Sequence, residues 1–190
     1  MLRLPTEHAL WLAGVAAQAG IRTMEVTMSQ ADYRETLAEL LRELPTTQVG
    51  IGSVRAAKDV ARAKDAGASF AVTPVLVPGA AAVAQEAEIP LVQGAATPSE
   101  IHQAWLEGSD VVKVFPADCL GGPRFVRSIL APMPELAVMP SGGVEPADVE
   151  AYLSAGACCV GLGSSIAPPG ALEARDADAV RASLALLQSP

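Results

Sequence analysis

The feature that most constrains the fold is a repeated alternation of short β-rich runs with helical segments. There are eight such runs, most of them closed by Gly, Pro, Ser or Thr, and they start about 20 to 26 residues apart. They are continuous apolar stretches, as in parallel strands that are buried on both faces. The runs are residues 1–4, 22–27, 48–53, 69–74, 90–95, 110–116, 136–143 and 158–165.

The segments between the runs carry helix signals at their ends. In "TPSEIHQAWLEGS", Thr97 and Glu100 have the spacing of a capping box, and Pro98 occupies the first helical position. "TEHALWLAGVAAQAG" opens on a Thr cap, and four segments end in an "AG" or "EG" step that is typical of glycine C-caps.

Eight strand–helix units in 190 residues predict a single α/β domain over residues 1–190, a compact (β/α)8 TIM barrel. The first strand is short, and we expect the N-terminal helix that would close the bottom of the barrel to be missing. A doubly wound open sheet is the alternative, because periodicity alone does not separate it from a barrel.

Composition excludes several classes of function. The net charge of −8, with no basic run, argues against a nucleic-acid partner. No stretch reaches the roughly 18 apolar residues of a membrane helix, and the first residues lack a signal peptide's apolar segment, so we expect a cytoplasmic protein. The two histidines exclude a histidine-rich metal centre but not a carboxylate-only magnesium site, and the three cysteines form no CxxC pair.

Two charged residues inside apolar runs are the candidate catalytic groups. Lys113 lies in "DVVKVFP", where desolvation would lower its pKa and allow the amine to attack a carbonyl. Glu25 lies in "TMEVT" and could act as a general acid and base with a raised pKa. The structural alternatives are a lysine that points out of the barrel and a carboxylate that only pairs with a cation.

The active site of a barrel lies at the carboxyl ends of its strands, where two glycine-rich loops stand out. "PSGGV" and "GLGSSI" end the last two runs, where barrels often bind phosphate through backbone N–H groups. The alternative is that these glycines only make tight turns. The candidate substrate-binding residues at the strand ends are Arg3, Ser53, Thr73, Phe115, Ser141, Gly142, Gly143, Gly163 and Ser164.

From about residue 1 to residue 170 the chain resembles the class I aldolases of 2-keto-3-deoxy-6-phosphogluconate (KDPG) and 4-hydroxy-2-oxoglutarate. "GIRTMEVTM" resembles the family's strand with its catalytic glutamate, and "VKVFPA" its Schiff-base strand. "VGIGSV", "FAVTP", "VQGAATPSE", "PSGGV" and "GLGSS" follow the family's motifs in order, and "MLR" resembles the end of its first strand.

The resemblance implies an aldolase of carbohydrate metabolism, as in the Entner–Doudoroff route. Lys113 would form an imine with a phosphorylated 2-oxo acid, and Glu25 would transfer protons. KDPG, its galactonate epimer or 4-hydroxy-2-oxoglutarate would yield pyruvate and an aldehyde, without a metal or an organic cofactor. The resemblance also implies a homotrimer.

The sequence departs from the family at one notable position. Many members have an arginine four residues after the glutamate, where it contacts the pyruvate carboxylate, and here that residue is Ser29. Three rival hypotheses follow from the residues. They are a phosphate-binding barrel isomerase or synthase, a degenerate barrel that binds a sugar acid without turnover, and a metal-dependent aldolase, which the histidine count disfavours.

Overall fold

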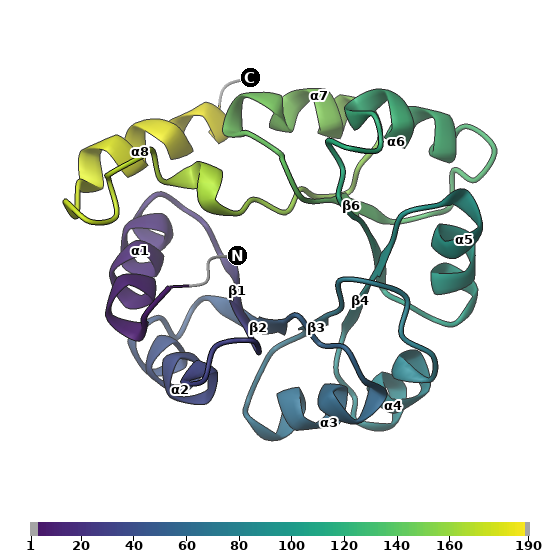
Figure 1. Ribbon diagram of the computed structural model, residues 1–190, viewed down its shortest axis with the longest axis horizontal. Helices are drawn as coiled ribbons and strands as arrows, with labels where there is room; N and C mark the ends of the chain where they lie inside the picture. The colour runs from purple at the N-terminus through teal and green to yellow at the C-terminus, as the bar shows by residue number, and fades with distance from the viewer. Residues whose placement is uncertain (1–3, 189–190) are drawn as a thin grey trace.

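The computed structural model describes residues 4–188, and in it a curved parallel sheet is surrounded by helices (Figure 1). Neighbouring strands along the sheet follow the order of the chain, and every pair is parallel. The strands are β1 Thr23–Thr27, β2 Gln48–Gly52, β3 Ala71–Val72, β4 Leu91–Ala95, β5 Val111–Val114 and β6 Val138–Pro140. Six of the eight predicted runs are therefore confirmed as strands.

Helices follow the strands and cover the outer side of the sheet, as Figure 1 shows. The α-helices are α1 Thr6–Gln18, α2 Tyr33–Glu43, α3 Ala57–Asp65, α4 Ala80–Glu86, α5 Pro98–Leu106, α6 Gly122–Leu130, α7 Val149–Ser154 and α8 Ala177–Ala185. Three short 3-10 turns are η1 Pro146–Asp148, η2 Ser164–Ile166 and η3 Leu186–Gln188. None of the helices within residues 4–188 is both long and apolar enough to cross a membrane.

The prediction of eight strands is not met in the part of the chain that the structure describes. The run 158–165 makes a single parallel bridge, between Gly161 and Ser141, and then turns into η2. Two glycines interrupt this run, and glycine weakens a strand because it has no side chain to pack. In the run 1–4, residues 1–3 lie outside the described residues, and Leu4 belongs to no strand.

The predicted helix ends are mostly confirmed. Thr97 and Glu100 form the capping box, with the Thr97 hydroxyl accepting from the Glu100 N–H. The glycines after α1, α3, α5 and α7 all have positive φ, which fits their role as C-caps. The prediction that a threonine caps the first helix is wrong. Thr6 is already helical, and its hydroxyl group donates to Asp32 on the loop before α2.

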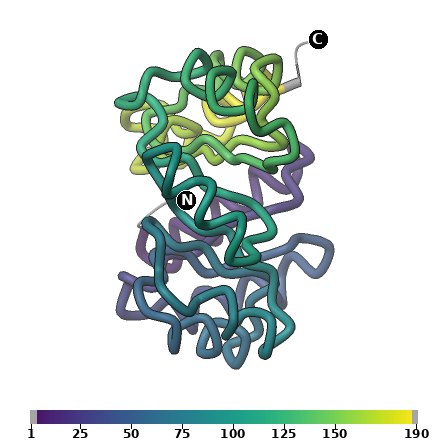
Figure 2. Tube along the Cα trace, turned by 90° about the vertical axis from the view of Figure 1, so that its right-hand side faces the viewer, coloured from purple at the N-terminus to yellow at the C-terminus, as the bar shows by residue number. Residues whose placement is uncertain are grey.

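Apolar contacts between α1 and α8 close the ring of helices. Leu12 on α1 packs with Val180 and Leu184 on α8 in a buried cluster. Figure 2 shows the purple N-terminal segment beside the yellow C-terminal segment. Two further clusters fill the space between sheet and helices, one under the strands from β1 to β4 and the other under those from β4 to β6. The helices therefore form a closed ring, whereas the sheet of described strands inside it is open.

Candidate active site

Strand β5 buries Lys113 almost completely, with 3% of its surface exposed. Its neighbours Val112 and Val114 are buried as well, and the strand lies between β4 and β6. The Lys113 Nζ atom lies 5.0 Å from the centroid of the Phe115 ring, within the range of a cation–π contact. Lys58 and Lys64 are exposed on α3, as predicted, so Lys113 occupies a different environment from the other lysines of the chain.

Strand β1 places the Glu25 side chain over Gly52 of β2. A Cβ atom on Gly52 would stand 1.4 Å from Glu25 Oε1, so only glycine leaves room for this carboxyl group. The Oε1 atom is buried and has no hydrogen-bond partner within the described chain. Burial raises the pKa of Glu25, and the positive charge of Lys113 opposes that rise. Such a carboxyl group is suited to give and to accept protons.

Glu25 and Lys113 act on each other across the interior of the curved sheet. Three strands separate β1 from β5 along the sheet, so the two side chains do not meet as sheet neighbours. The positive charge of Lys113 nevertheless acts to lower the pKa of Glu25, so the two groups lie within electrostatic reach of each other. No ion pair within 4.0 Å involves Lys113 among residues 4–188. Neither structural alternative, an outward-pointing lysine or a simple ion pair, describes this arrangement.

Three hydroxyl groups gather at the carboxyl end of β1 and β2. The Thr27 hydroxyl donates to Ser53 Oγ over 2.8 Å, and Thr27 Oγ1 lies 2.7 Å from Ser29 Oγ. Ser53 has a φ of 60°, a conformation that is rare for residues other than glycine. The Ser53 side chain is therefore held in place by both its backbone and Thr27, and Ser29 joins the same cluster.

Thr73 differs from the other predicted binding residues, because its hydroxyl group is already used by the main chain. Its Oγ1 donates to the Val75 carbonyl over 2.6 Å and accepts from the Gly94 N–H over 2.9 Å. The side chain is fully buried. These contacts fix the turn after β3 against β4.

The two glycine-rich loops and Phe115 line one cleft of about 1250 Å³. Gly142 and Gly143 have φ values of 88° and 67°, and a Cβ on Gly142 would lie 2.9 Å from the Phe115 ring. Glycine at position 142 therefore allows the loop to pack directly on the ring that covers Lys113. The predicted residues in this cleft are Phe115, Ser141, Gly142, Gly143, Gly163 and Ser164.

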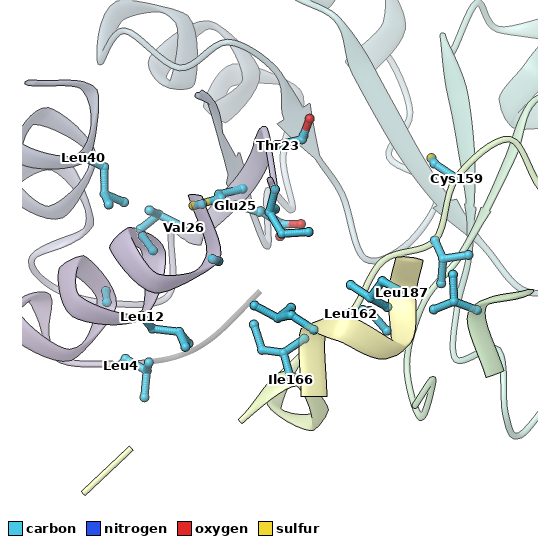
Figure 3. A pocket seen from close by; sticks show the side chains of 18 of the residues that line it. Leu4, Leu12, Thr23, Glu25, Val26, Leu40, Cys159, Leu162, Ile166 and Leu187 are labelled. Carbon is cyan, nitrogen blue, oxygen red and sulfur yellow. The ribbon is translucent and has the colours of Figure 1, made fainter. Parts of the chain in front are cut away.

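A second, mostly apolar cavity of about 340 Å³ adjoins the cleft. Glu25 lines it from β1, while Leu162, which also lines the cleft, faces it from the opposite side (Figure 3). Leu12 from α1 and Leu187 from η3 complete its apolar wall. The catalytic carboxyl candidate thus stands against apolar surface, which accounts for its raised pKa.

Some cleft residues had no distinctive signal in the sequence. Ala179, Ala182 and Ser183 of α8 form one wall of the cleft, and Leu186 of η3 extends it. Their pattern is that of any helix that packs on a core, so only the three-dimensional arrangement identifies them. Ser165 also lines the cleft, but its hydroxyl group donates to the Val144 carbonyl.

Arg3, the remaining predicted binding residue, lies outside the described residues. Within residues 4–188 no three His, Cys, Asp or Glu side chains come close enough together to hold a metal ion.

Comparison with known proteins reveals one family. Residues 4–183 match the family model described as KDPG and KHG aldolase. The KHG/KDPG aldolase of Escherichia coli (strain K12) is 34% identical over 175 residues, which cover 92% of this chain and 82% of that protein. The 2-dehydro-3-deoxy-phosphogluconate aldolase of Pseudoalteromonas atlantica is 33% identical, with 92% and 81% covered.

A solved structure extends this similarity to the fold. The KDPG aldolase of Legionella pneumophila, with pyruvate captured as a covalent carbinolamine intermediate, superposes with a TM-score of 0.89. The two sequences are 29% identical, and the match covers 100% of this chain and 92% of that one.

Proposed function

The chain belongs to the KDPG and KHG aldolase family, and on that premise we propose that Lys113 is its Schiff-base nucleophile and Glu25 its acid–base group. The enzyme is a carbon–carbon lyase that cleaves a 2-oxo acid into pyruvate and an aldehyde. KDPG, its galactonate epimer and 4-hydroxy-2-oxoglutarate are the proposed substrates. With KDPG the aldehyde is glyceraldehyde 3-phosphate.

The chemistry starts at the Lys113 amine, which attacks the ketone carbon of the 2-oxo acid. The resulting carbinolamine loses water and leaves a protonated imine, which withdraws electrons as the bond between C3 and C4 breaks. Glu25 accepts the proton of the C4 hydroxyl group and later helps to return a proton to the enamine. Hydrolysis then releases pyruvate and restores the amine.

The surrounding residues fit the two ends of such a substrate. The hydroxyl groups of Ser53 and Ser29 lie beside Thr27 at the carboxyl ends of β1 and β2, where they can donate to the substrate carboxylate. The loops around Gly142 and Gly163 line the cleft beyond Phe115, where backbone N–H groups and the Ser141 hydroxyl can meet a phosphate. The Phe115 ring lies against the Lys113 nitrogen and favours its cationic iminium form.

One observation carries the assignment of roles. A lysine that is 3% exposed lies opposite a carboxyl group whose pKa is raised by burial, and no ion pair within the described chain neutralises the lysine. A cation buried without a paired anion costs stability, so its retention is expected where it serves chemistry.

Borohydride trapping tests the assignment directly. The protein is incubated with pyruvate and borohydride, and its mass and tryptic peptides are then measured. We expect a stable pyruvyl adduct on the peptide that contains Lys113. Lys58→Ala and Lys64→Ala are matched controls that should keep the adduct, and Lys113→Ala should lose it. An adduct that survives in folded Lys113→Ala would overturn the assignment.

Glu25→Gln separates proton transfer from imine formation. This variant should still trap pyruvate, while aldol cleavage slows by about 10² to 10⁴-fold. A near-normal cleavage rate would remove Glu25 from the mechanism.

Tight binding of KDPG by the unmodified protein, with no turnover at high enzyme concentration, would favour the degenerate sugar-acid binder instead.

We further propose that the chain forms a closed (β/α)8 barrel, assembles as a homotrimer and acts in the cytoplasm. The bridge between Gly161 and Ser141 supports a barrel, since it adds the run 158–165 to the edge of β6. Exposed apolar side chains such as Val75 and Leu106 support assembly, because association would remove them from water. Sedimentation equilibrium should give three times the chain mass of 19.4 kDa.

A further inference from the structure

The apolar cavity of about 340 Å³ beside Glu25 has no part in the binding of a phosphorylated substrate. Figure 3 shows Leu12, Ile166 and Leu187 around the same space as Glu25. Small-molecule sites are typically hollows of about 300–1,000 Å³ with a mostly apolar wall and a few placed polar groups. The cavity has the size and the lining of such a site.

The wall of this cavity favours an uncharged ligand. No lysine, arginine or histidine lines it among residues 4–188, so a phosphate or carboxylate placed there would have no cation to pair with. Apart from Glu25, its polar side chains are the uncharged Thr23, Gln30 and Cys159. A hydrocarbon group in the cavity would exchange water for apolar contacts, which is favourable.

Glu25 connects the cavity with the reaction. In the proposed mechanism Glu25 exchanges a proton with the oxygen on C4, so C4 of the substrate stands at this carboxyl group. The group attached to C4 is the remainder of the aldehyde product, and it can extend from Glu25 into the space that the carboxyl group lines. The cleft lined by Phe115 and the glycine-rich loops is the alternative space, and its loops suit a phosphate instead.

We propose that the cavity receives the hydrocarbon chain of an unphosphorylated aliphatic aldehyde, which the enzyme joins to pyruvate. The reverse reaction releases the same aldehyde from a 4-hydroxy-2-oxo acid with an alkyl tail. This inference rests on the proposed roles of Lys113 and Glu25, and it adds a second class of substrate to the same site.

The addition balances without any further reactant. Glu25 takes a proton from the methyl group of the pyruvate imine on Lys113, which leaves an enamine. The electron pair of the enamine forms the bond between C3 and the aldehyde carbon, and the aldehyde oxygen takes the proton back from Glu25. Hydrolysis of the imine then frees the 4-hydroxy-2-oxo acid and restores the amine. Neither an oxidant nor a reductant is needed.

A series of straight-chain aldehydes measures the fit of the chain to the cavity. Propanal, butanal, pentanal and hexanal have the same reactive group and differ by one CH₂ group at each step. With saturating pyruvate, kcat/KM for addition should rise about fourfold for each CH₂ group that is buried, until the cavity is full. Mass spectrometry of the 4-hydroxy-2-oxo acids gives the rates. A flat or falling series would overturn the proposal.

Substitutions on α1 test where the chain binds. Ala16 is 4% exposed and lines the cavity, whereas its half-buried neighbour Ala17 does not line it. Ala16→Leu should lower kcat/KM for hexanal by about tenfold or more and change that for propanal by less than about twofold, because the leucine occupies the far part of the cavity. Ala17→Leu is the matched control and should keep the series of the parent.

Ala13, which also lines the cavity, offers a smaller change if Ala16→Leu does not fold. Ala13→Val should lower the rate with hexanal more than the rate with propanal. Both cavity variants should keep the parent's rate with glyceraldehyde 3-phosphate, whose phosphate is expected at the glycine-rich loops. Equal losses with propanal and hexanal, or no loss with hexanal, would overturn the proposal.

Borohydride trapping with pyruvate separates this inference from the proposed function. A pyruvyl adduct on Lys113 together with a flat aldehyde series would overturn the role of the cavity and leave the aldolase assignment intact. The absence of an adduct on the folded parent would overturn the aldolase assignment and this inference with it.

Discussion

At Lys113, catalysis and stability make opposite demands on one side chain. Methionine has a similar length and no charge, so Lys113→Met should lower aldol cleavage on the order of 10⁴-fold or more, as removal of a nucleophile does. The same change removes a buried charge and should leave the melting temperature unchanged or raise it. Activity and thermal unfolding measured on the same preparation test both halves. A melting temperature several degrees below the parent would make Lys113 a structural residue.

Glu25 should make the stability of the protein depend on pH in a specific direction. Its pKa in the folded protein is raised above the ordinary value of 4.5, chiefly by burial. As the pH rises past 4.5, the unfolded chain releases this proton while the folded protein still keeps it. The free energy of unfolding therefore falls with rising pH until the pH reaches the pKa of Glu25 in the folded protein. Below that window both states keep the proton.

Glu25→Gln isolates this contribution, because glutamine has the same shape and does not titrate. The difference in melting temperature between variant and parent should be smallest near pH 4 and should widen in favour of the variant towards neutral pH. Thermal unfolding at several pH values measures this difference. A difference that stays constant, or narrows with rising pH, would show that burial does not penalise the charged form of Glu25.

Among the elements, the loop after β6 is held in shape by glycine. Gly142 has a φ of 88°, and a Cβ there would press on the Phe115 ring at 2.9 Å. Gly142→Ala should therefore cost about 1–2 kcal/mol of stability and slow imine formation, because the ring shifts relative to Lys113. Urea unfolding and the rate of borohydride trapping measure the two effects.

Gly14 offers the matched control within helix α1. A Cβ at Gly14 would meet no atom within 4 Å, and the residue has an ordinary helical backbone. Gly14→Ala should stabilise the protein by about 0.5–1 kcal/mol, since alanine is the better helix former. If Gly142→Ala stabilised the protein as Gly14→Ala is expected to do, the strain at Gly142 would be refuted.

The sequence predicted the elements well where the local signal was strong. Continuous apolar runs located six strands, and the spacing of Thr97 and Glu100 located the start of α5. The run 158–165 misled the prediction, because its apolar composition resembles a strand while its glycines and η2 limit pairing to one bridge. Local composition does not reveal whether an edge strand has a partner.

Local sequence patterns singled out the candidate site residues, but not the contacts that their side chains make. Charged side chains inside apolar runs identified Lys113 and Glu25, and the structure places both in the interior. The hydroxyl group of Thr73 is instead used by the main chain at Val75 and Gly94. Whether a hydroxyl group such as that of Thr73 remains available for a ligand depends on contacts with residues far away in the sequence, here Gly94.

At the scale of the whole molecule, helices α1 and α8 join the two ends of the chain. Two kinds of contact connect them or their flanks. Arg175 forms an ion pair with Glu7 on α1, in which both side chains are largely exposed, and Leu184 of α8 is 2% exposed in the apolar cluster. Exposed ion pairs contribute little to the free energy of unfolding, whereas a buried leucine contributes much. Closure of the ring should therefore depend on apolar packing.

Leu184→Ala should lower the free energy of unfolding by about 2–5 kcal/mol, because it removes buried apolar surface and leaves a cavity between α1 and α8. Glu7→Gln should change it by less than about 1 kcal/mol, since water screens the exposed charge that it removes. Urea unfolding of both variants, followed by circular dichroism, measures the two costs on the same scale. Equal costs would mean that the exposed ion pair contributes as much as the buried leucine to holding the ends of the chain together. A larger cost for Leu184→Ala in a single cooperative transition would mean that the α1–α8 contact belongs to the same folding unit as the sheet that carries Glu25 and Lys113.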